Sequence, residues 1–261
     1  MPIEVTPELV TETAAWLPSY TGHLVRAVVL GIVHTSNSSM AGALHEANKP
    51  KPYSVTSLNF RSTARTTDSY SIDSSYPATF KVRFLEDEYA SDFLSSLKRN
   101  DTINFGGTNF RVIRIHVRTL SYQALVNQTN EADVFQLIFK SPTYLASKMS
   151  GFHYLFPEPV RLFLNLAKLW NRFAQGFEIA DLNAYARWLR NDIGVTGYEL
   201  RTRQTTFGER QAVGFKGWVN FRLMERNQWN KATLTLAKFA ELSNVGANRT
   251  GGFGVVRFYP K

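Results

Sequence analysis

Hydrophobic and polar residues alternate in short segments along the chain, and longer amphipathic or apolar runs separate these segments. Alternation indicates strands, whereas apolar residues three or four positions apart indicate helices. The first half has the order β-α-β-β-α-β, with a second short helix after the first. Its predicted elements are Ile3 to Val10, Gly22 to His34, Ser38 to Glu46, Tyr53 to Phe60, Ala78 to Glu86, Tyr89 to Lys98 and Asn109 to Val117.

The second half repeats this order. Its predicted elements are Val134 to Lys140, Val160 to Phe173, Leu182 to Arg190, Tyr198 to Thr206, Ala212 to Leu223, Trp229 to Leu242 and Val255 to Tyr259. We therefore predict an α+β fold of two tandem ferredoxin-like (RRM-like) domains, residues 1–128 and 129–261, joined near Asn127 to Asp133. The polar stretch Arg61 to Tyr76 is expected to form a surface loop.

Composition is typical of a folded chain, with 44% hydrophobic and 20% charged residues among 261. The sequence has no cysteine, which excludes a disulfide framework and thiolate metal sites and suits a reducing cytoplasm. The longest apolar run, Ala27 to Val33, is too short to span a bilayer, and no Lys or Arg precedes Arg26. We expect a soluble cytoplasmic protein with no membrane partner.

Positive charge is concentrated in the second half. Residues 1–140 hold 13 Lys and Arg against 13 Asp and Glu, whereas residues 141–261 hold 17 against 8. A polyanion is the natural partner of such a surface, because cations that neutralise phosphates release condensed counterions. A basic surface kept for solubility is the alternative.

A glycine-rich segment lies between the last predicted helix and the last predicted strand. Glycines permit positive φ and close approach of the backbone, so successive amides can form an anion-binding nest. A helix cap followed by a turn is the alternative interpretation. The candidate phosphate-binding residues are Asn244, Gly246, Arg249, Gly251, Gly252 and Gly254.

Further arginines of the second half are candidates for phosphate contacts. Arg187 and Arg190 end one predicted helix, and Arg201 and Arg203 project from one face of a predicted strand. Planar guanidinium groups suit the phosphates of a polyanion. A solvated face with scattered ion pairs is the alternative.

Several motifs resemble the CRISPR-associated repeat-processing endoribonucleases of the Cas-six type, in the RAMP superfamily. The resemblance spans most of the chain, and the glycine-rich loop is the family's signature. This chain starts the loop with Asn244-Val245-Gly246 where the family usually has Gly-hydrophobic-Gly, and Asn tolerates a left-handed backbone. The other matching segments are Leu44-His45, Tyr53 to Leu58, Phe139 to Tyr144 and Gly214-Phe-Lys-Gly217.

The resemblance implies cleavage of precursor RNA within each repeat by attack of its own 2′-hydroxyl, with no metal or other cofactor. The products would be a cyclic phosphate and a 5′-hydroxyl. His45 matches the family's Leu-His position and is the first catalytic candidate. Its predicted place at a helix C-terminus favours imidazolium, and therefore the role of acid over that of base.

Three further residues are catalytic candidates. His23 and Arg26 share a helical face, but the family often has Arg before His, so their division into base and charge stabiliser stays open. Lys51, held extended between Pro50 and Pro52, is a cation for the phosphate or a solvated lysine. His34 lies on the face of His23 three turns later, too distant to share its chemistry.

Two other functions remain open from the sequence. One is a non-cleaving subunit of a CRISPR ribonucleoprotein that binds repeat RNA, either a stem-loop or unstructured. Effector-complex subunits are possible partners of either form. The other is an enzyme that uses the glycine-rich loop for a nucleotide, although the loop follows a helix and lacks Gly-Lys-Ser/Thr.

Overall fold

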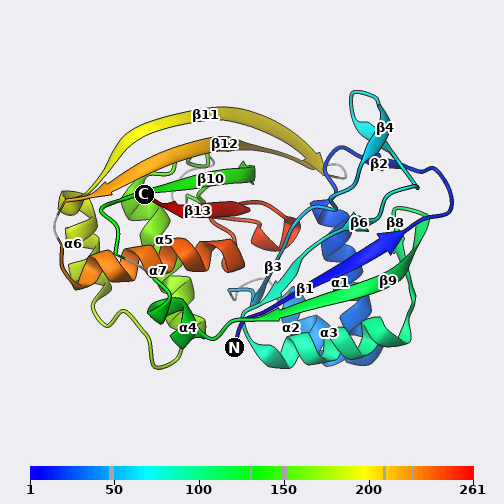
Figure 1. Cartoon of the computed structure of the whole chain (residues 1–261), viewed down its shortest axis with the longest axis horizontal. Coiled ribbons are helices and arrows are strands. Elements are labelled where there is room, and N and C mark those ends of the chain that lie inside the picture. Colours follow the sequence, from blue (N-terminus) through cyan, green and yellow to red (C-terminus); the bar gives the residue numbers. More distant parts are fainter. Residues whose placement is uncertain (47–49, 130, 148–151, 208–209, 225) are drawn as a thin grey trace. The chain divides into compact units, whose positions relative to one another are not determined.

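The computed structural model describes residues 1–46, 50–129, 131–147, 152–207, 210–224 and 226–261. The chain divides into two compact units. Unit 1 comprises Met1–Thr119 together with Thr250–Gly252, and unit 2 comprises Leu120–Arg249 and Phe253–Lys261. Figure 1 shows the elements of each unit. Residue 130, in the predicted linker, lies outside the described residues.

Unit 1 is built on a sheet whose main path has the order β3-β7-β1-β9-β8, with antiparallel neighbours. The first four of these strands give the order second, third, first, fourth of a ferredoxin-like domain. The short strand β6 (Ala78–Thr79) also pairs with β1. The elements are β1 (Ile3–Val10), α1 (Gly22–Ser36), α2 (Ser38–His45), β3 (Tyr53–Val55), β7 (Val82–Phe84), α3 (Asp87–Arg99), β8 (Thr102–Phe105) and β9 (Thr108–Thr119).

Unit 2 has the same topology, in a four-stranded sheet of order β11-β12-β10-β13. In Figure 1 its helices α5, α6 and α7 lie on one side of this sheet. The prediction of two tandem ferredoxin-like folds is confirmed. The elements are α4 (Tyr122–Asn127), β10 (Val134–Thr143), α5 (Pro159–Phe173), α6 (Leu182–Asp192), β11 (Ile193–Phe207), β12 (Arg210–Leu223), α7 (Gln228–Ser243), the 3-10 turn η1 (Arg249–Gly251) and β13 (Val256–Pro260).

Local sequence explains where several helices begin. The Glu158 carboxylate accepts from the amides of Val160 and Arg161, and Pro159 occupies the first turn of α5. Asp181 caps α6 in the same way. In α3, acidic residues in the first turn and basic residues in the last turn complement the helix dipole. No helix in the described part of the chain is both long and apolar enough to cross a bilayer.

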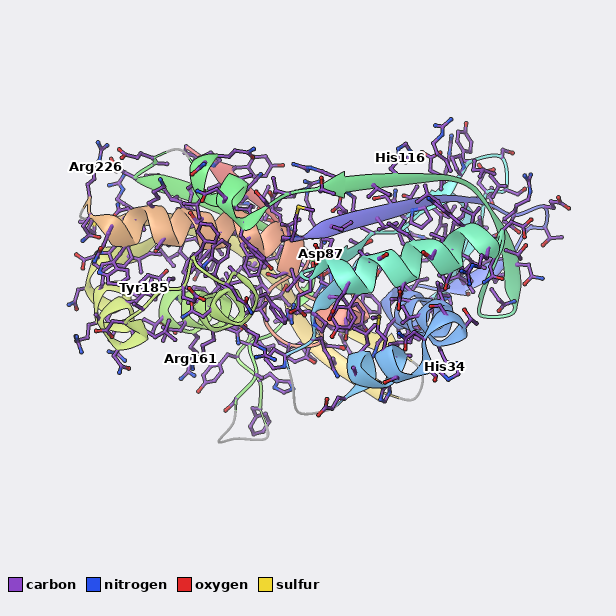
Figure 2. All side chains as sticks on the ribbon, turned by 90° about the horizontal axis from the view of Figure 1, so that it is seen from below. His34, Asp87, His116, Arg161, Tyr185 and Arg226 are labelled. Carbon is purple, nitrogen blue, oxygen red and sulfur yellow. The ribbon has the colours of Figure 1, made fainter. Side chains whose placement is uncertain are left out.

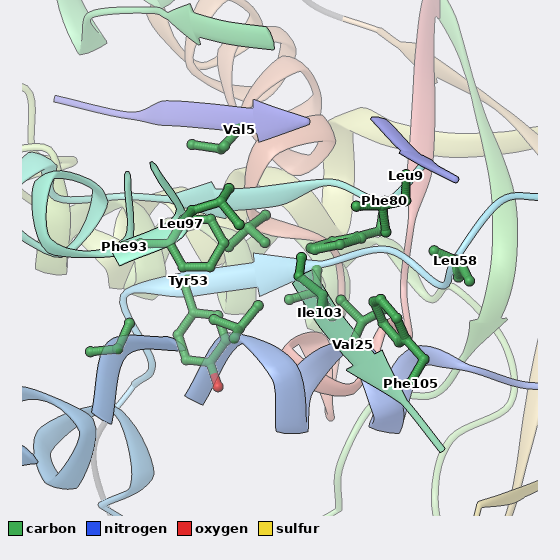
Figure 3. Packing of buried hydrophobic residues seen from close by; sticks show 14 of the residues in the cluster. Val5, Leu9, Val25, Tyr53, Leu58, Phe80, Phe93, Leu97, Ile103 and Phe105 are labelled. Carbon is green, nitrogen blue, oxygen red and sulfur yellow. The ribbon is translucent and has the colours of Figure 1, made fainter. Parts of the chain in front are cut away.

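Each unit has an apolar core between its helices and its sheet. In unit 1, Val5 of β1, Val25 of α1 and Phe93 of α3 are fully buried together (Figure 3). In unit 2, the Phe135 ring stacks on Phe221 at 5.2 Å between centroids and meets Phe163 edge-on at 5.9 Å. Aromatic pairs of this kind add to the stabilisation from area burial.

Three sequence predictions for unit 1 are wrong in detail. The expected loop from Arg61 to Tyr76 contains strands β4 (Ser62–Arg65) and β5 (Ser69–Ile72), which form a small sheet with β2 (Trp16–Pro18). Ser and Thr dominate these strands and β4 is exposed throughout, so no hydrophobic alternation marks them.

The strand predicted from Tyr53 to Phe60 ends at Val55. Beyond it, the Leu58 amide donates to Thr21 Oγ1 at 2.9 Å, at the start of α1, and not to a neighbouring strand. The predicted strand Ala78 to Glu86 is likewise split into β6 and β7. Thr56 and Asn59 still donate to the carbonyls of Lys81 and Thr79, so pairing continues at single residues and the predicted continuous strand is interrupted.

Candidate functional site

His45 is the last residue of α2, and its imidazole is exposed. The helix begins where the Asn37 side chain accepts from the Met40 amide at 3.0 Å. Met40 and the fully buried Leu44 pack on the core of unit 1, as their spacing predicts. Burial of Leu44 leaves His45 on the outer end of the helix, where it can meet a ligand.

Lys51 lies beside the end of α2. Its ammonium donates to the carbonyl oxygen of Glu46, the residue after His45. Burial lowers the pKa of Lys51, the positive charge of Arg26 lowers it further, and Glu46 opposes the shift. The charges of Arg26 and Lys51 thus interact, and Lys51 contacts the residue that follows His45.

His23 lies in the first turn of α1. Burial lowers the pKa of its imidazole, and a hydrogen bond with the Tyr20 backbone partly offsets the shift. The net effect favours the neutral ring, which can accept a proton. Leu30, two turns along α1, lines a groove with His45. His23 is two turns before Leu30, so it lies roughly 10 Å along the helix axis from the part of α1 that lines this groove.

The tip of the glycine-rich loop, Thr250–Gly252, belongs to unit 1 and packs at the start of α1. Tyr20 donates its hydroxyl proton to the Gly251 carbonyl at 2.8 Å. A Cβ at Gly22 would overlap the same carbonyl oxygen, so glycine is required where the loop meets the helix. The predicted residues Gly251 and Gly252 therefore lie next to the helix turn that carries His23.

The remainder of the loop belongs to unit 2 and closes α7. Asn244 is buried with φ of 57°, and its side-chain amide donates to the Arg249 carbonyl at 3.2 Å. Asn244 thus adopts a positive φ, as the sequence prediction allowed, but its ψ of 172° lies outside the left-handed helical region. Arg249 donates from its guanidinium to the Ser243 carbonyl at 2.7 Å, at the end of the helix. The loop thus has a structural role, and phosphate binding by it stays a prediction.

The loop does not have the arrangement of a nucleotide-binding P-loop. It follows the C-terminus of α7, and the helical residues after it are the 3-10 turn Arg249–Gly251. A P-loop leads instead into the N-terminus of a helix, whose amides receive the phosphates.

A cationic cluster lies on the sheet of unit 2, which we call the sheet cations: Lys140, Arg201, Arg203 and Lys216. Arg201 and Arg203 are exposed on β11, and Arg201 is the cross-strand partner of Lys216 on β12. Burial, then the charges of Arg203 and Lys140, lower the pKa of Lys216. Only Arg201 of the four has an acidic partner among the described residues, Glu199 at 3.1 Å.

Arg187 and Arg190 are both exposed on α6, as predicted, and neither has a salt bridge within the described ranges. Sequence reasoning missed Lys140 and Lys216. Both stand inside segments that match the family, Phe139 to Tyr144 and Gly214 to Gly217, and each alternates with buried phenylalanines. That alternation was the available signal, although their proximity depends on the pairing of β10 with β12.

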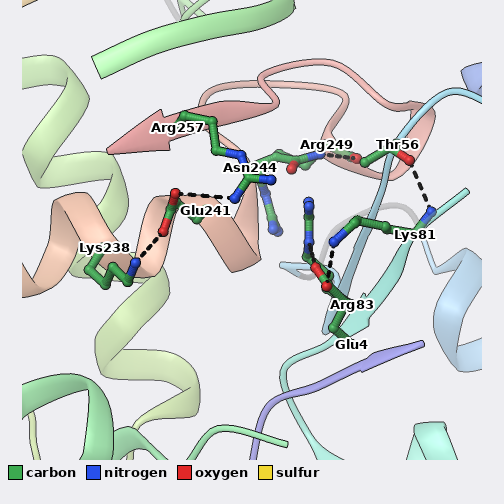
Figure 4. A network of polar contacts seen from close by, with 9 residues as sticks. All are labelled: Glu4, Thr56, Lys81, Arg83, Lys238, Glu241, Asn244, Arg249 and Arg257. Atoms are coloured by element: carbon green, nitrogen blue, oxygen red, sulfur yellow. Dashed lines mark hydrogen bonds and ion pairs between the residues drawn. The ribbon is translucent and has the colours of Figure 1, made fainter. Parts of the chain in front are cut away.

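Other cations are already neutralised inside their own unit (Figure 4). In unit 1, Glu4 accepts from Lys81 at 2.6 Å and from Arg83 at 2.7 Å. In unit 2, Glu241 pairs with Lys238 at 2.7 Å and with Arg257 at 3.7 Å. These pairs are structural, which sets them apart from the sheet cations. In the described part of the chain, no group of three or more His, Asp or Glu side chains is placed to hold a metal ion.

Comparison with known proteins places these features in context. The model of a family described as CRISPR-associated endoribonuclease Cas6 matches residues 137–256. No curated protein matches the chain by sequence. The family match confirms the resemblance that the motifs indicated.

Solved structures share the fold along the whole chain. A Cas6 product complex from Thermus thermophilus is 22% identical, covers 99% of each chain and has a TM-score of 0.81. A second Cas6 product complex is 21% identical, covers 99% of this chain and 100% of that chain, and has a TM-score of 0.76. A RAMP protein described as binding different RNA substrates is 15% identical over 99% of each chain, with a TM-score of 0.69.

Proposed function

We propose that this chain, a Cas6-family protein by the match over residues 137–256, is an endoribonuclease that cleaves CRISPR precursor RNA within each repeat. One observation carries the proposal: an exposed histidine, His45, ends a helix beside Lys51, whose ammonium donates to the carbonyl of the next residue, Glu46. The product complexes of similar Cas6 proteins support repeat RNA as the substrate.

The reaction requires one base, one acid and compensation of phosphorane charge. A base removes the proton of the 2′-hydroxyl, and the 2′-oxygen then attacks the adjacent phosphorus. The bond from phosphorus to the 5′-oxygen breaks, and an acid protonates that oxygen. A 2′,3′-cyclic phosphate and a 5′-hydroxyl result, with no metal ion taking part.

The residues of unit 1 suit these roles unequally. His23, whose pKa is lowered by burial, is the candidate base because its ring is neutral near pH 7. His45, at the C-terminus of α2, is the candidate acid. Arg26 and Lys51 would stabilise the charge of the phosphorane. The sheet cations and the arginines of α6 would hold the RNA through its phosphates.

Single-turnover cleavage of a repeat RNA in excess EDTA tests the proposal. We expect one cut per repeat, products with the two ends named above, and no cut when the 2′-hydroxyl at the cleavage position is replaced by hydrogen. Loss of activity in chelator that a divalent metal restores would contradict the metal-independent mechanism. A contaminating nuclease is excluded when His45→Ala, purified identically, does not cut.

The alternative function is a non-cleaving subunit that binds repeat RNA. It is favoured by the sheet cations, which occur in unit 2 independently of His45. Tight, salt-dependent binding of repeat RNA without any cut would select this function over the endoribonuclease.

A further inference from the structure

A groove of about 870 Å³ lies between α1 and α2 in unit 1. His34, near the end of α1, lines one wall, and His45, at the end of α2, lines the other. Figure 2 labels His34 on α1. Both imidazoles are exposed, and within the described ranges neither makes a hydrogen bond or an ion pair. The residues around the groove are Leu30, His34, Ser38, Ala41, Gly42, Ala43, His45 and Glu46.

The groove continues the catalytic face of α1. Arg26, Leu30 and His34 are four residues apart, so they form one stripe along the helix. At one end of this stripe the positive charge of Arg26 lowers the pKa of Lys51, a candidate catalytic residue. His34 lies two turns further along α1, roughly 12 Å from Arg26 along the helix axis. This length exceeds what one phosphate group occupies, so an RNA strand at His45 has room for a neighbouring nucleotide beside His34.

The lining favours a nucleobase over a second phosphate. Small residues, Ala41 to Ala43, form a low apolar wall, and Leu30 adds an aliphatic surface opposite them. Lys and Arg are absent from the described residues that line the groove, and the charge of Glu46, which does line it, interacts with that of Lys51. A neutral, flat ring fits these surfaces, and the volume lies within the range of about 300–1,000 Å³ of small-ligand sites.

We propose that the groove between α1 and α2 is a nucleobase subsite, in which the base next to the scissile phosphate packs on Ala41–Ala43 and stacks on the His34 ring. His34 is therefore a substrate-contact residue that helps to hold the RNA at His45. The inference rests on the proposed function, because it takes His45 as the catalytic centre.

Gly42 offers a way to fill the subsite without disturbing the fold. It is exposed on α2, has no positive φ, and a Cβ built there meets nothing within 4 Å. Gly42→Leu is therefore expected to fold normally and to slow single-turnover cleavage about 10-fold to 100-fold, the equivalent of one base stack. Gly31→Leu is the matched control, because Gly31 is also exposed, helical and free of Cβ contacts, yet lines no part of this groove. It should cleave at the unchanged rate.

His34 is tested with RNAs in which one nucleotide at a time, on either side of the cut, lacks its base. The unchanged protein should be slowed about 10-fold to 100-fold at a single abasic position. His34→Ala should be slow on intact RNA by a similar factor and insensitive to that abasic position, because the two changes remove the same contact. His34→Phe, which keeps a flat ring, should retain most of the rate.

Three results would overturn the subsite. The first is an unchanged rate for His34→Ala on intact RNA, and the second is equal rates for Gly42→Leu and Gly31→Leu. The third is that the rate losses from His34→Ala and from an abasic nucleotide multiply at every abasic position. Each requires that the unchanged protein cleaves RNA. If it does not cleave, the proposed function itself fails, so the two failures are distinct. Thermal unfolding of each variant excludes misfolding as the cause of a lost rate.

Discussion

Units 1 and 2 share one strand order but carry their candidate cations on different kinds of element. By sequence, unit 1 holds 12 Lys and Arg against 11 Asp and Glu, and unit 2 holds 18 against 10. In unit 1, His45, Arg26 and Lys51 gather at helices α1 and α2. In unit 2, three of the four sheet cations lie on strands β10, β11 and β12 without an acidic partner among the described residues.

The difference teaches that this topology does not dictate where a ligand binds. A ferredoxin-like sheet with two crossing helices supplies a rigid frame, and short charged segments added to either surface decide its use. Buried ion pairs such as Glu4 with Arg83 stabilise the frame, whereas we expect the like charges around Lys216 to bind a polyanion. The predictions below test whether catalysis depends on unit 1 and RNA binding on unit 2.

The largest effect is expected for His45→Ala. Removing one group that transfers a proton should lower the single-turnover rate by on the order of 10² to 10⁴, with RNA affinity nearly unchanged. His116→Ala is the matched control in unit 1, because this exposed histidine pairs with Glu8 at 2.8 Å on the sheet. A normal rate in His45→Ala, or equal losses in both variants, would remove His45 from the chemistry.

Arg26→Ala and Lys51→Ala sharpen the same comparison within unit 1. Each should reduce the rate less than His45→Ala and also weaken binding, because either cation can hold phosphate as well as stabilise charge. Rates measured at saturating protein separate the two contributions. If His23→Ala proves more damaging than His45→Ala, His23 takes the leading role as base.

Gly254→Val should cost about 3 kcal/mol of unfolding free energy or more. Gly254 has φ of 70°, and a Cβ there would overlap the carbonyl oxygen of Val245. Thermal unfolding measures the loss. RNA affinity, corrected for the folded fraction, then tells whether the loop also cradles phosphate: normal binding by the folded protein would reject the cradle.

Glu4→Gln tests a structural charge of unit 1. Burial raises the pKa of Glu4, but Arg83 and Lys81 outweigh it, so the net shift is downward from 4.5. The ionised form therefore adds stability that is complete above pH 4.5 and is lost as the pH falls through the lowered value. We expect Glu4→Gln to lose about 2 kcal/mol at pH 7.

Denaturant unfolding at several pH values measures this difference, which should shrink below pH 4.5 as the unchanged protein loses the same interaction. RNA affinity per folded molecule should not change. A gap that persists undiminished in acid would mean that packing, and not the ion pair, carries the effect.

Lys216→Ala should have the smallest effect, and in contrast to Glu4→Gln it should change RNA binding and not reduce stability. Removing one phosphate contact should weaken RNA binding and lower the slope of log affinity against log salt by about one, with stability kept or slightly raised as repulsion from Arg203 is relieved. Lys238→Ala, which removes a lysine already paired with Glu241, is the control. Equal salt slopes for both variants would contradict the proposal that the sheet cations bind RNA phosphates.

The sequence predicted the helices and long strands of both units because they are strongly periodic. The helix α5 carries buried residues along its whole inner face, and its predicted bounds differ from the structure by a single residue. Strands β4 and β5 escaped because serine and threonine hide their alternation. Apolar residues that recur periodically over a long segment thus predict a buried face, whereas strands rich in polar residues lack this pattern and are not predicted.

The candidate site was only partly accessible from sequence. His45 and Lys51 followed from motifs, and the structure brings them together through the Glu46 carbonyl. His34 and His45 line one groove because α2 packs against α1. Lys140 lies near Lys216 because of the register in which β10 pairs with β12. Such long-range contacts leave no local pattern, so they required the fold. The roles of all these residues stay predictions.

The division of the chain also bears on the timing of its synthesis. Thr250–Gly252 completes unit 1, yet about 130 residues separate it from Thr119, where the rest of that unit ends. At 5–20 residues per second, a nascent unit 1 waits roughly 10 s with Gly22 and Tyr20 uncovered. The start of α1, which carries His23, therefore acquires its final surroundings only after most of unit 2 has been synthesised.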